Sequence, residues 1–390
     1  MPIFVCYHTK TDMKKTLLLT LALAVMMPLG AQEIVKGSIE DVPRQGSYQP
    51  TFKSDGAKKK PLNIILMIGD GTGLAQIASG YFANNHELTV MNLKHMGFVT
   101  TRSATDFTTD SAASGTAYAC GIKTYNYAVG VDQEKNPAPN IPEVVAKKGV
   151  VSGVVSTDAL DGATPASFFA HQPNRGMADE IWADLPASEL IFFAAGDKER
   201  FEKRSEATQK AVKESFTVVD NLNDPAYAKA SRLGYLPTKV EAGYIVDGRT
   251  DFLPKSTRYA MNFLKDHSAR KRGFFLMVEG ARIDKAAHAN QFESMVKEML
   301  DFDKAIAEAI RFADEDGNTL VIISADHETG ALSIADGNPA EGKVSGTYVS
   351  TWHTAIPVPI FAYGPHAQDF MGCQGNDEVG RKIMNLLTGK

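Results

Sequence analysis

The stretch that decides the fold is Leu62-Asn63-Ile64-Ile65-Leu66-Met67-Ile68, followed by Gly69-Asp70-Gly71. A mostly apolar run of this length, ended by a glycine-rich turn, predicts a strand buried on both faces of a sheet. The acid Asp70 would then lie at the carboxyl end of that strand, where open α/β sheets place their sites. The segment therefore predicts both an α/β protein and the edge at which its site lies.

Further apolar runs alternate with amphipathic segments along the rest of the chain. We expect strands at 97–103, 150–156, 190–194, 216–219, 274–278, 319–324 and 356–362, and helices from about 74 and at 141–148, 253–267, 290–314 and 377–387. This alternation predicts a mainly parallel central sheet flanked by helices on both faces. Residues 328–352, rich in Gly, Ser and Ala, are expected to form a small irregular surface insertion.

The N-terminal residues predict export. Lys14 and Lys15 precede an apolar run over residues 16–29, which is too short for a comfortable membrane span, and Gly30-Ala31-Gln32 follows as a cleavage site. We expect a signal peptide with an upstream extension over 1–31, an N-terminal arm over 32–60 and a single domain over 61–390. The mature protein should be periplasmic or secreted, with no transmembrane anchor.

The composition is that of a soluble globular protein: 390 residues, 44% hydrophobic, 22% charged, with a net charge of −5. This balance argues against a nucleic-acid-binding surface. Only Cys120 and Cys373 would remain after export, and we expect two buried free thiols rather than a disulfide framework.

A candidate nucleophile lies in Asp110-Ser111-Ala112-Ala113-Ser114-Gly115-Thr116-Ala117. The run of small residues predicts a helix that starts at the serine. The first turn of a helix has unpaired N–H groups and a positive dipole end, so it can hold an anion. Ser111 is therefore either a nucleophile beside a phosphate or an ordinary helix-capping serine.

Acids and histidines recur just past the predicted strand ends: Asp70, Glu279, Asp284, His288, Asp326, His327 and His353. Asp284 and His288 are four residues apart, on one face of a helical turn, and a carboxylate with an imidazole suits zinc. Asp326 and His327 can converge only if the chain bends there. The other histidines of the predicted domain, at 86, 95, 171, 267 and 366, are expected to be structural.

Taken in order, these segments resemble the alkaline phosphatases. The resemblance spans about residue 62 to the C-terminus and rests on Ile68-Gly69-Asp70-Gly71, Thr109-Asp110-Ser111-Ala112-Ala113, Ala163-Thr164-Pro165, His171-Gln172-Pro173-Asn174-Arg175, Val278-Glu279-Gly280, Ile283-Asp284-Lys285 with His288, Ala325-Asp326-His327 and Trp352-His353-Thr354. It implies an alkaline-phosphatase-like fold, hydrolysis of phosphate monoesters through a phosphoserine on Ser111, and a homodimer.

The resemblance also implies two zinc ions and one magnesium ion. Asp284, His288 and His353 would hold the first zinc; Asp70, Asp326, His327 and the Ser111 oxygen the second; Asp70, Thr164 and Glu279 the magnesium. Imidazole and carboxylate suit zinc, and an all-oxygen set suits magnesium. Arg175 would clamp two phosphate oxygens, and Lys285 would lie near the phosphate.

The chain departs from the family at Gly162. Well-known bacterial members have an Asp at that position, which holds a magnesium-bound water and pairs with the lysine matched by Lys285. Here the neighbouring acid is Asp161, one residue earlier. We therefore expect Lys285 to be less neutralised and magnesium to be held more weakly.

Three alternatives fit less well. A phosphodiesterase of the same superfamily would keep the zinc pair but usually lacks the third metal, and Arg175, Thr164 and Glu279 favour a monoester. A sulfatase would need Cys or Ser followed by x-Pro-x-Arg, unlike Ser111-Ala-Ala-Ser-Gly. An inactive phosphate-binding protein would not need a complete set of nucleophile, ligands and arginine.

Overall fold

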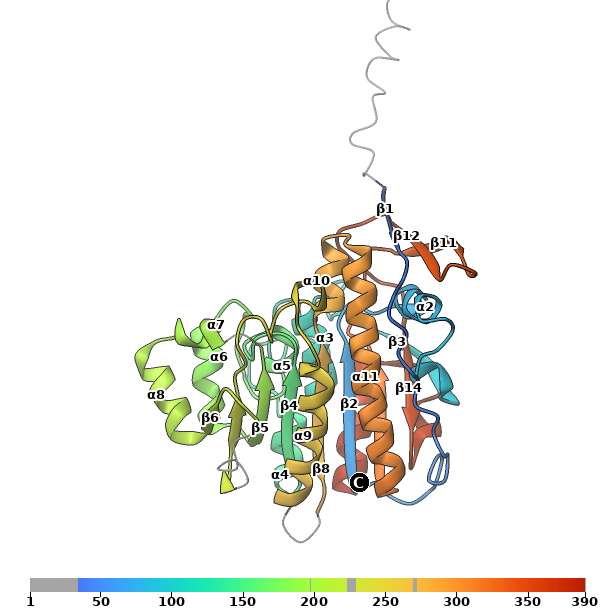
Figure 1. Cartoon of the computed structure of the whole chain (residues 1–390). Coiled ribbons are helices and arrows are strands. Elements are labelled where there is room, and N and C mark those ends of the chain that lie inside the picture. The colour runs from blue at the N-terminus through green and yellow to red at the C-terminus, as the bar shows by residue number, and fades with distance from the viewer. Residues whose placement is uncertain (1–33, 197, 223–228, 269–271, 390) are drawn as a thin grey trace, which may run out of the picture. The chain divides into compact units, whose positions relative to one another are not determined.

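A sheet of ten described strands, in the order β15-β3-β14-β9-β2-β8-β4-β5-β7-β6, runs through the protein (Figure 1). The computed structural model describes residues 34–196, 198–222, 229–268 and 272–389, so the predicted signal peptide lies outside the described residues. The elements are β1 (Val35–Ile39), β2 (Asn63–Gly69), α2 (Leu74–Ala83), β3 (His95–Thr100), α3 (Ser111–Cys120), α4 (Ile141–Ala146), β4 (Val151–Ser156), α5 (Ala163–Ala166), α6 (Ala178–Asp184), β5 (Leu190–Ala195), α7 (Lys198–Glu202), α8 (Glu206–Ser215), β6 (Thr217–Val219), β7 (Leu233–Tyr235), α9 (Phe252–His267), β8 (Phe274–Gly280), α10 (Arg282–His288), α11 (Phe292–Asp316), β9 (Thr319–Ser324), β10 (Glu328–Thr329), β11 (Ser333–Asn338), β12 (Lys343–Tyr348), β13 (His353–Thr354), β14 (Val358–Tyr363), β15 (Gly372–Gly375) and α12 (Asn376–Thr388).

The predicted mainly parallel sheet is confirmed, with one strand reversed. β2 pairs in parallel with β8 on one side and β9 on the other, and β4 pairs in parallel with β8 and β5. β14 runs antiparallel to both β9 and β3. The residues that precede β14 therefore lie at the same edge as the residues that follow the parallel strands.

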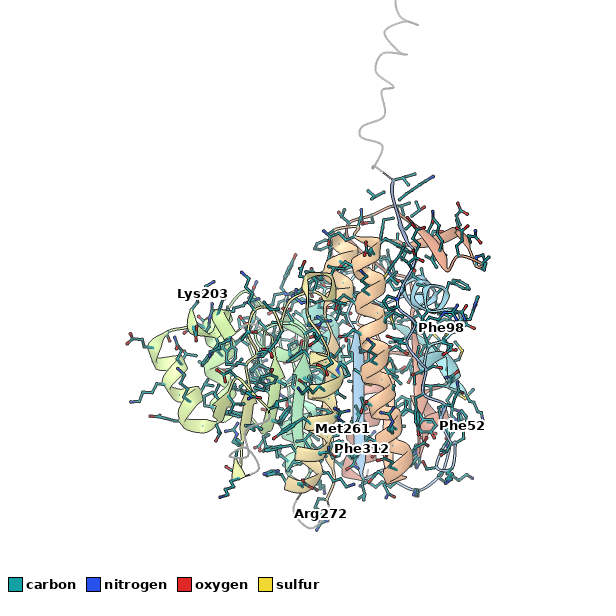
Figure 2. All side chains as sticks on the ribbon, in the orientation of Figure 1. Phe52, Phe98, Lys203, Met261, Arg272 and Phe312 are labelled. Carbon is teal, nitrogen blue, oxygen red and sulfur yellow. The ribbon has the colours of Figure 1, made fainter. Side chains whose placement is uncertain are left out.

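Helices cover both faces of the sheet, as the alternation of elements predicts. Because side chains alternate along a strand, Ile65 and Met67 of β2 enter one core, and Ile64 and Leu66 enter the other. The first core is closed by α9 and α11, from which Met261 and Phe312 point inward (Figure 2). The second core is closed by helices that include α3, α4 and α12. All seven residues of β2 are buried, as expected of a strand with both faces covered.

The expectation of an irregular insertion over 328–352 is wrong. Residues of this segment form β11 and β12, an antiparallel hairpin, and β1 from the N-terminal arm adds to β12 to give a separate three-stranded sheet. The pattern was hidden because Gly337 and Gly346 lie within the strands, where glycine weakens a strand prediction. Gly346 has a reason: a Cβ there would collide with the Phe292 ring of α11.

The two cysteines of the described chain are unpaired. Cys120 is buried at the end of α3, as expected, but Cys373 on β15 is exposed, contrary to expectation. Within the described residues, no helix is both long enough and apolar enough to cross a membrane.

The arm is fastened to α11 through one carboxylate. Asp314 accepts hydrogen bonds from the Tyr48 hydroxyl at 2.8 Å, from the Thr51 backbone at 2.9 Å and from the Thr51 hydroxyl at 2.8 Å. The Tyr363 hydroxyl of β14 donates to the same carboxylate. Burial opposes ionisation, but these hydrogen bonds outweigh it and lower the pKa of Asp314.

We predict that Asp314→Ala lowers the free energy of unfolding by about 2 kcal/mol, because it leaves several donors without their charged acceptor. Since the pKa of the folded state is lowered, the loss should be full above about pH 4 and fade as the pH falls below that value. Denaturant unfolding at pH 7 and pH 3 measures it. The exposed neighbour Glu315→Ala is the control, and equal unfolding curves for both variants would contradict the prediction.

Candidate active site

The carboxyl ends of three adjacent parallel strands, β9, β2 and β8, supply most of the candidate residues. Asp70 directly follows β2, Glu279 lies near the end of β8, and Asp326 and His327 come two and three residues after β9. His353 reaches the same edge because it precedes the reversed strand β14. The bend that the sequence required after β9 is present, since Thr329 of β10 pairs with His353 of β13.

Ser111 is the first residue of α3 rather than its cap. Asp110 is the N-cap, and its Oδ1 accepts the Ala113 N–H at 3.0 Å. The Ser111 hydroxyl takes no part in capping the helix. It lies 3.3 Å from the Nε2 of His327. Ser111 is 4% exposed. Of the two readings of this serine, the structure excludes the ordinary helix cap.

Asp110 also positions the arginine. Its Oδ2 pairs with the Nη1 of Arg175 at 3.0 Å, while its Oδ1 accepts the Tyr127 N–H. The Arg175 N–H in turn donates to the Tyr127 carbonyl at 2.8 Å. The guanidinium is thus fixed beside the start of α3 and keeps about a third of its side chain exposed. The sequence singled out Asp110 as the acid before Ser111 but did not predict that it also pairs with Arg175.

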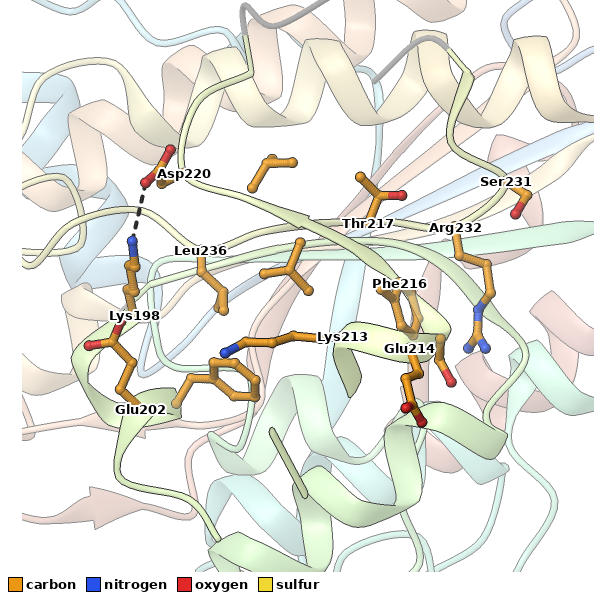
Figure 3. A pocket seen from close by; sticks show the side chains of 14 residues that line it. Lys198, Glu202, Lys213, Glu214, Phe216, Thr217, Asp220, Ser231, Arg232 and Leu236 are labelled. Atoms are coloured by element: carbon orange, nitrogen blue, oxygen red, sulfur yellow. Dashed lines mark hydrogen bonds and ion pairs between the residues drawn. The ribbon is translucent and has the colours of Figure 1, made fainter. Parts of the chain in front are cut away.

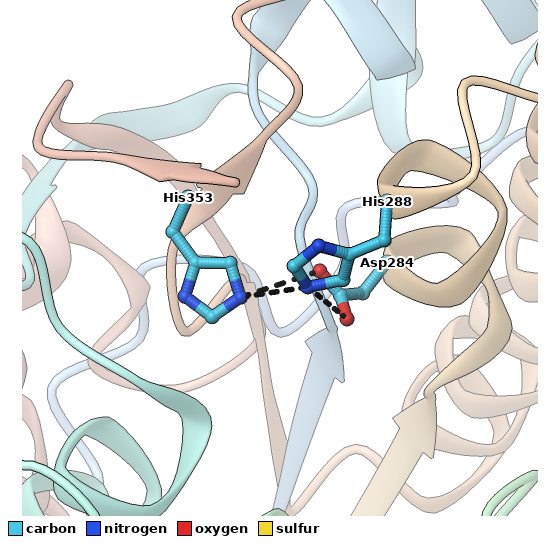
Figure 4. Close-up of side chains that lie close together, drawn as sticks. All are labelled: Asp284, His288 and His353. Atoms are coloured by element: carbon cyan, nitrogen blue, oxygen red, sulfur yellow. Dashed lines mark hydrogen bonds and ion pairs between the residues drawn. The ribbon is translucent and has the colours of Figure 1, made fainter. Parts of the chain in front are cut away.

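Asp284, His288 and His353 converge as the sequence predicted for the first two (Figure 4). The two Nε2 atoms of His288 and His353 are 2.9 Å apart. Asp284 lies 3.3 Å from the Nε2 of His288 and 3.8 Å from the Nε2 of His353. Two imidazole nitrogens and a carboxylate around one point form a donor set for a divalent cation.

Each of these histidines has its other nitrogen occupied by the backbone. The Nδ1 of His288 lies 2.6 Å from the Thr351 carbonyl, and the Nδ1 of His353 lies 2.8 Å from the Thr109 carbonyl. A carbonyl can only accept, so Nδ1 carries the proton and Nε2 presents its lone pair to the cluster. Burial lowers the pKa of His353 to about 4, and the neighbouring His327 adds to the shift, which favours the neutral ligand form.

A second group lies deeper, around His327. Its Nε2 is 3.1 Å from Asp326 Oδ2, 3.5 Å from Asp70 Oδ1 and 3.3 Å from the Ser111 hydroxyl. Asp70, Asp284 and His327 also lie close enough to share one cation, so Asp284 borders both groups. The Thr329 hydroxyl lies 3.2 Å from the Nδ1 of His327 and donates to Asp284, which ties the groups together.

The site concentrates buried negative charge. Burial raises the pKa of Asp70 well above its usual value, and Asp326, Asp284 and Glu279 raise it further. Burial, followed by the charge of Asp158, raises the pKa of Glu279 to about 8. Carboxylates packed together in this way need compensating cations.

Three buried oxygens of the site make no hydrogen bond within the described protein: Thr164 Oγ1, and Asp70 Oδ1 and Asp326 Oδ2, which have only their ion-pair contacts with His327. Such atoms are uncommon in native interiors and need a partner. Thr164 lies in the short helix α5, which packs against α3. Together with the lone pairs of the histidines, these oxygens fit the binding of divalent cations.

The expectation that Lys285 lacks an acidic partner is wrong. Its Nζ pairs with the Oδ1 of Asp158, which follows β4 by two residues. A Cβ at Gly162 would lie 2.6 Å from the Oδ2 of Asp158, so the absent side chain leaves the room that this carboxylate fills. Burial opposes its ionisation, but Lys285 outweighs burial and lowers the pKa of Asp158 to about 2. An acid just past a strand end is the signal that could have identified Asp158.

Gly71 shows how tightly the site is packed. Its φ is +71°, and a Cβ there would lie 2.8 Å from Cα, Cβ and Oδ1 of Asp284. Only glycine therefore allows the turn after β2 to approach α10 this closely. The turn also places the Gly71 N–H 3.1 Å from Asp326 Oδ1.

A cleft of about 810 Å³ lies elsewhere, beside β6 and α8, and includes the ion pair of Lys198 with Asp220 (Figure 3). None of the candidate residues lines it. The five histidines expected to be structural also stay outside both cation groups; His171, for example, pairs with Glu143 at 3.0 Å.

Comparisons with known proteins agree on one family. The sequence profile described as alkaline phosphatase matches residues 61–194 and 243–350. Alkaline phosphatase 3 of Bacillus subtilis is 32% identical, with 96% of this chain and 98% of that protein covered. The solved alkaline phosphatase of the Antarctic bacterium TAB5 is 38% identical and superimposes with a TM-score of 0.79, covering 85% of this chain and 98% of the other. A point mutant of the TAB5 enzyme with Mg bound in a site called M3 is 36% identical, with a TM-score of 0.78 and coverage of 85% and 99%.

We predict that Asp70→Asn has opposite effects with and without cations. In the chelated protein it should raise the melting temperature by a few degrees, because it removes one buried charge from the carboxylate cluster. Since the pKa of Asp70 is raised on folding, this gain should be absent below about pH 4 and grow as the pH rises. In the cation-loaded protein the same change should lower both the melting temperature and the metal content.

Thermal melts with and without chelator, together with metal analysis, measure these effects. Asp303→Asn is the matched control, since Asp303 is a buried acid that accepts the Thr89 and Val90 N–H groups outside the site. Its effect should have the same sign in both states. A fall in the melting temperature of chelated Asp70→Asn would contradict the prediction.

Proposed function

Because this chain belongs to the alkaline phosphatase family, and is therefore a phosphoric monoester hydrolase, we propose that it works through a phosphoserine intermediate on Ser111. The observation that carries the proposal is the position of the Ser111 oxygen. It lies free of capping, at the first turn of α3 and 3.3 Å from His327, within the group of cation-binding side chains.

We propose two zinc ions and one magnesium ion as cofactors. Asp284, His288 and His353 would hold the first zinc; Asp70, Asp326 and His327 the second; Asp70, Thr164 and Glu279 the magnesium. The backbone hydrogen bonds that orient His288 and His353, the Asp70 and Thr164 oxygens that make no hydrogen bond, and the Mg bound in the M3 site of the TAB5 mutant support this assignment. When bound, the cations would supply positive charge that favours an ionised Ser111 oxygen and a departing alkoxide.

The side chains of the site would then divide the work. In the first step the Ser111 hydroxyl gives its proton to solvent and its oxygen forms a bond to phosphorus while the ester P–O bond breaks, and the alcohol leaves with a proton taken from solvent. In the second step water forms a bond to phosphorus and loses a proton, the Ser111–phosphorus bond breaks, the Ser111 oxygen takes up a proton, and inorganic phosphate leaves. The α3 N-terminus, Arg175 and Lys285 would hold the phosphate oxygens in both steps.

Arg175 and Lys285 are each held by an acid, which tunes how strongly they attract phosphate. Asp110 fixes the Arg175 guanidinium at 3.0 Å, so little side-chain entropy is lost when phosphate binds. Asp158 partly neutralises Lys285. We propose that Asp158 replaces, from a different position, the acid that the sequence lacks at residue 162.

Export and self-association are proposed on separate grounds. Cleavage after Ala31 would leave β1 intact, and N-terminal sequencing of the mature protein tests it.

A homodimer is supported by the outward face of β3, where Met96 and Phe98 are 44% and 41% exposed. Light scattering that gives the monomer mass would contradict the homodimer.

We predict that Ser111→Ala lowers kcat on 4-nitrophenyl phosphate by about a thousandfold or more, because the nucleophile is lost. The variant should keep its metal content and form no covalent phosphate by intact-protein mass spectrometry. Ser205→Ala is the matched control, since Ser205 is a helix-start serine that caps α8 far from the site. A Ser111→Ala enzyme that keeps more than about a tenth of kcat would contradict the covalent route.

The same assay separates a monoesterase from a phosphodiesterase. Activity on 4-nitrophenyl phosphate should far exceed activity on its bis ester, and chelator should abolish both. The reverse preference would favour the phosphodiesterase alternative.

We predict that Asp158→Asn strengthens inhibition by inorganic phosphate about threefold to tenfold, because the Lys285 ammonium loses its neutralising partner. The size is modest because the Lys285 side chain is about a third exposed. The Asp158→Asn/Lys285→Met double variant should lose this gain. If Asp158→Asn leaves phosphate inhibition unchanged at low salt, the pairing has no role in phosphate binding.

A further inference from the structure

Trp352 is an exposed indole at the mouth of the site. It directly precedes His353 and is 55% exposed, whereas the other tryptophan, Trp182, is 1% exposed. Its ring stacks on His353 with centroids 4.9 Å apart and planes 9° apart, and it lies 5.4 Å from the His288 ring. A large aromatic surface left in water beside a catalytic site is available to a ligand.

Both backbone groups of Trp352, its N–H and its carbonyl, are hydrogen-bonded. The Trp352 N–H donates to the Ser350 hydroxyl at 2.9 Å, and its carbonyl accepts the Gly330 N–H at 2.9 Å. Gly330 has a φ of +90°, and a Cβ there would collide with the Tyr348 ring. Because the backbone is held and one face of the ring already stacks on His353, a ligand that stacks on the ring costs little side-chain entropy in the protein.

A row of stacked rings leads from the nucleophile to the indole. Ser111 lies 3.3 Å from His327, His327 stacks on His353 with centroids 3.4 Å apart, and His353 stacks on Trp352. The nucleophile is thus at one end of the row and the indole at the other. An in-line displacement at phosphorus places the attacking and leaving oxygens on opposite sides. The leaving group therefore departs toward His353 and Trp352.

We propose that Trp352 is a specificity-determining residue that stacks on a planar aromatic leaving group, so that aryl phosphates are favoured over alkyl phosphates. This inference rests on the proposed function, since it needs the in-line attack by Ser111. A purely structural role, in which the indole only steadies His353, uses one face of the ring and leaves its exposure unexplained.

The kinetic test uses the metal-loaded enzyme and two variants, Trp352→Leu and Trp352→Phe. For Trp352→Leu, kcat/KM on phenyl phosphate should fall about threefold to tenfold, mainly through KM, while kcat/KM on ethyl phosphate changes less than twofold. Trp352→Phe should keep most of the preference. Inhibition by inorganic phosphate and zinc content should not change, because neither involves the leaving group. Phe82→Leu, at another exposed aromatic residue, is the matched control.

The binding test needs no turnover. Since Trp182 is buried, the emission of Trp352 can be isolated by comparing wild type with Trp352→Phe. Phenylphosphonate should quench the wild-type emission and bind more tightly than methylphosphonate, and the quenching should vanish in Trp352→Phe. This measurement decides the question even if Trp352→Leu fails to fold.

The proposed function and the role of Trp352 are overturned by different results. A wild-type enzyme that hydrolyses neither monoester overturns the proposed function. An active enzyme in which Trp352→Leu loses equally on both substrates, or in which the two phosphonates bind alike, overturns only the role of Trp352. Acrylamide quenching that is equal in wild type and Trp352→Phe would mean that a second copy covers the indole, which also overturns it.

Discussion

The structure depends on compensating a cluster of buried carboxylates. Asp70, Glu279, Asp284 and Asp326 are all at least 90% buried. Burial and neighbouring acids raise the pKa values of Asp70 and Glu279, whereas the histidines of the site lower those of Asp284 and Asp326. The ordered backbone bonds of the histidines and the glycine turn at Gly71 follow from the need to hold these groups around cations.

The sheet achieves this convergence with one reversed strand. The residues that follow the parallel strands β2, β8, β9 and β4 all lie at one edge of the sheet. In a fully parallel sheet, a further crossover helix would be needed before His353 could lie at that edge. Because β14 runs the other way, the residues before it arrive directly. The Trp352-His353 pair and Thr351, which holds His288, therefore come from one short segment.

Most of the sheet, and the acids and histidines that converge at one edge of it, could be predicted from the sequence, because buried strands are long apolar runs and these residues follow their ends. The β11–β12 hairpin could not, since Gly337 and Gly346 interrupt its pattern, and of these Gly346 is required by the Phe292 ring. Asp158 was missed for a different reason. Whether it or Asp161 reaches Lys285 depends on the path of the turn after β4, which no local pattern encodes. The exposure of Cys373 likewise depends on β15 lying at the sheet edge.

The small sheet joins the first strand of the described chain to a strand far along it, and this has a consequence for the order of folding. β1, at residues 35–39, pairs with β12, at residues 343–348, so it cannot find its partner until nearly the whole chain has been synthesised. Contacts this far apart in sequence form late, because a long loop must close first. β1 thus stays unpaired until β12 has formed, and its docking is among the last steps of folding.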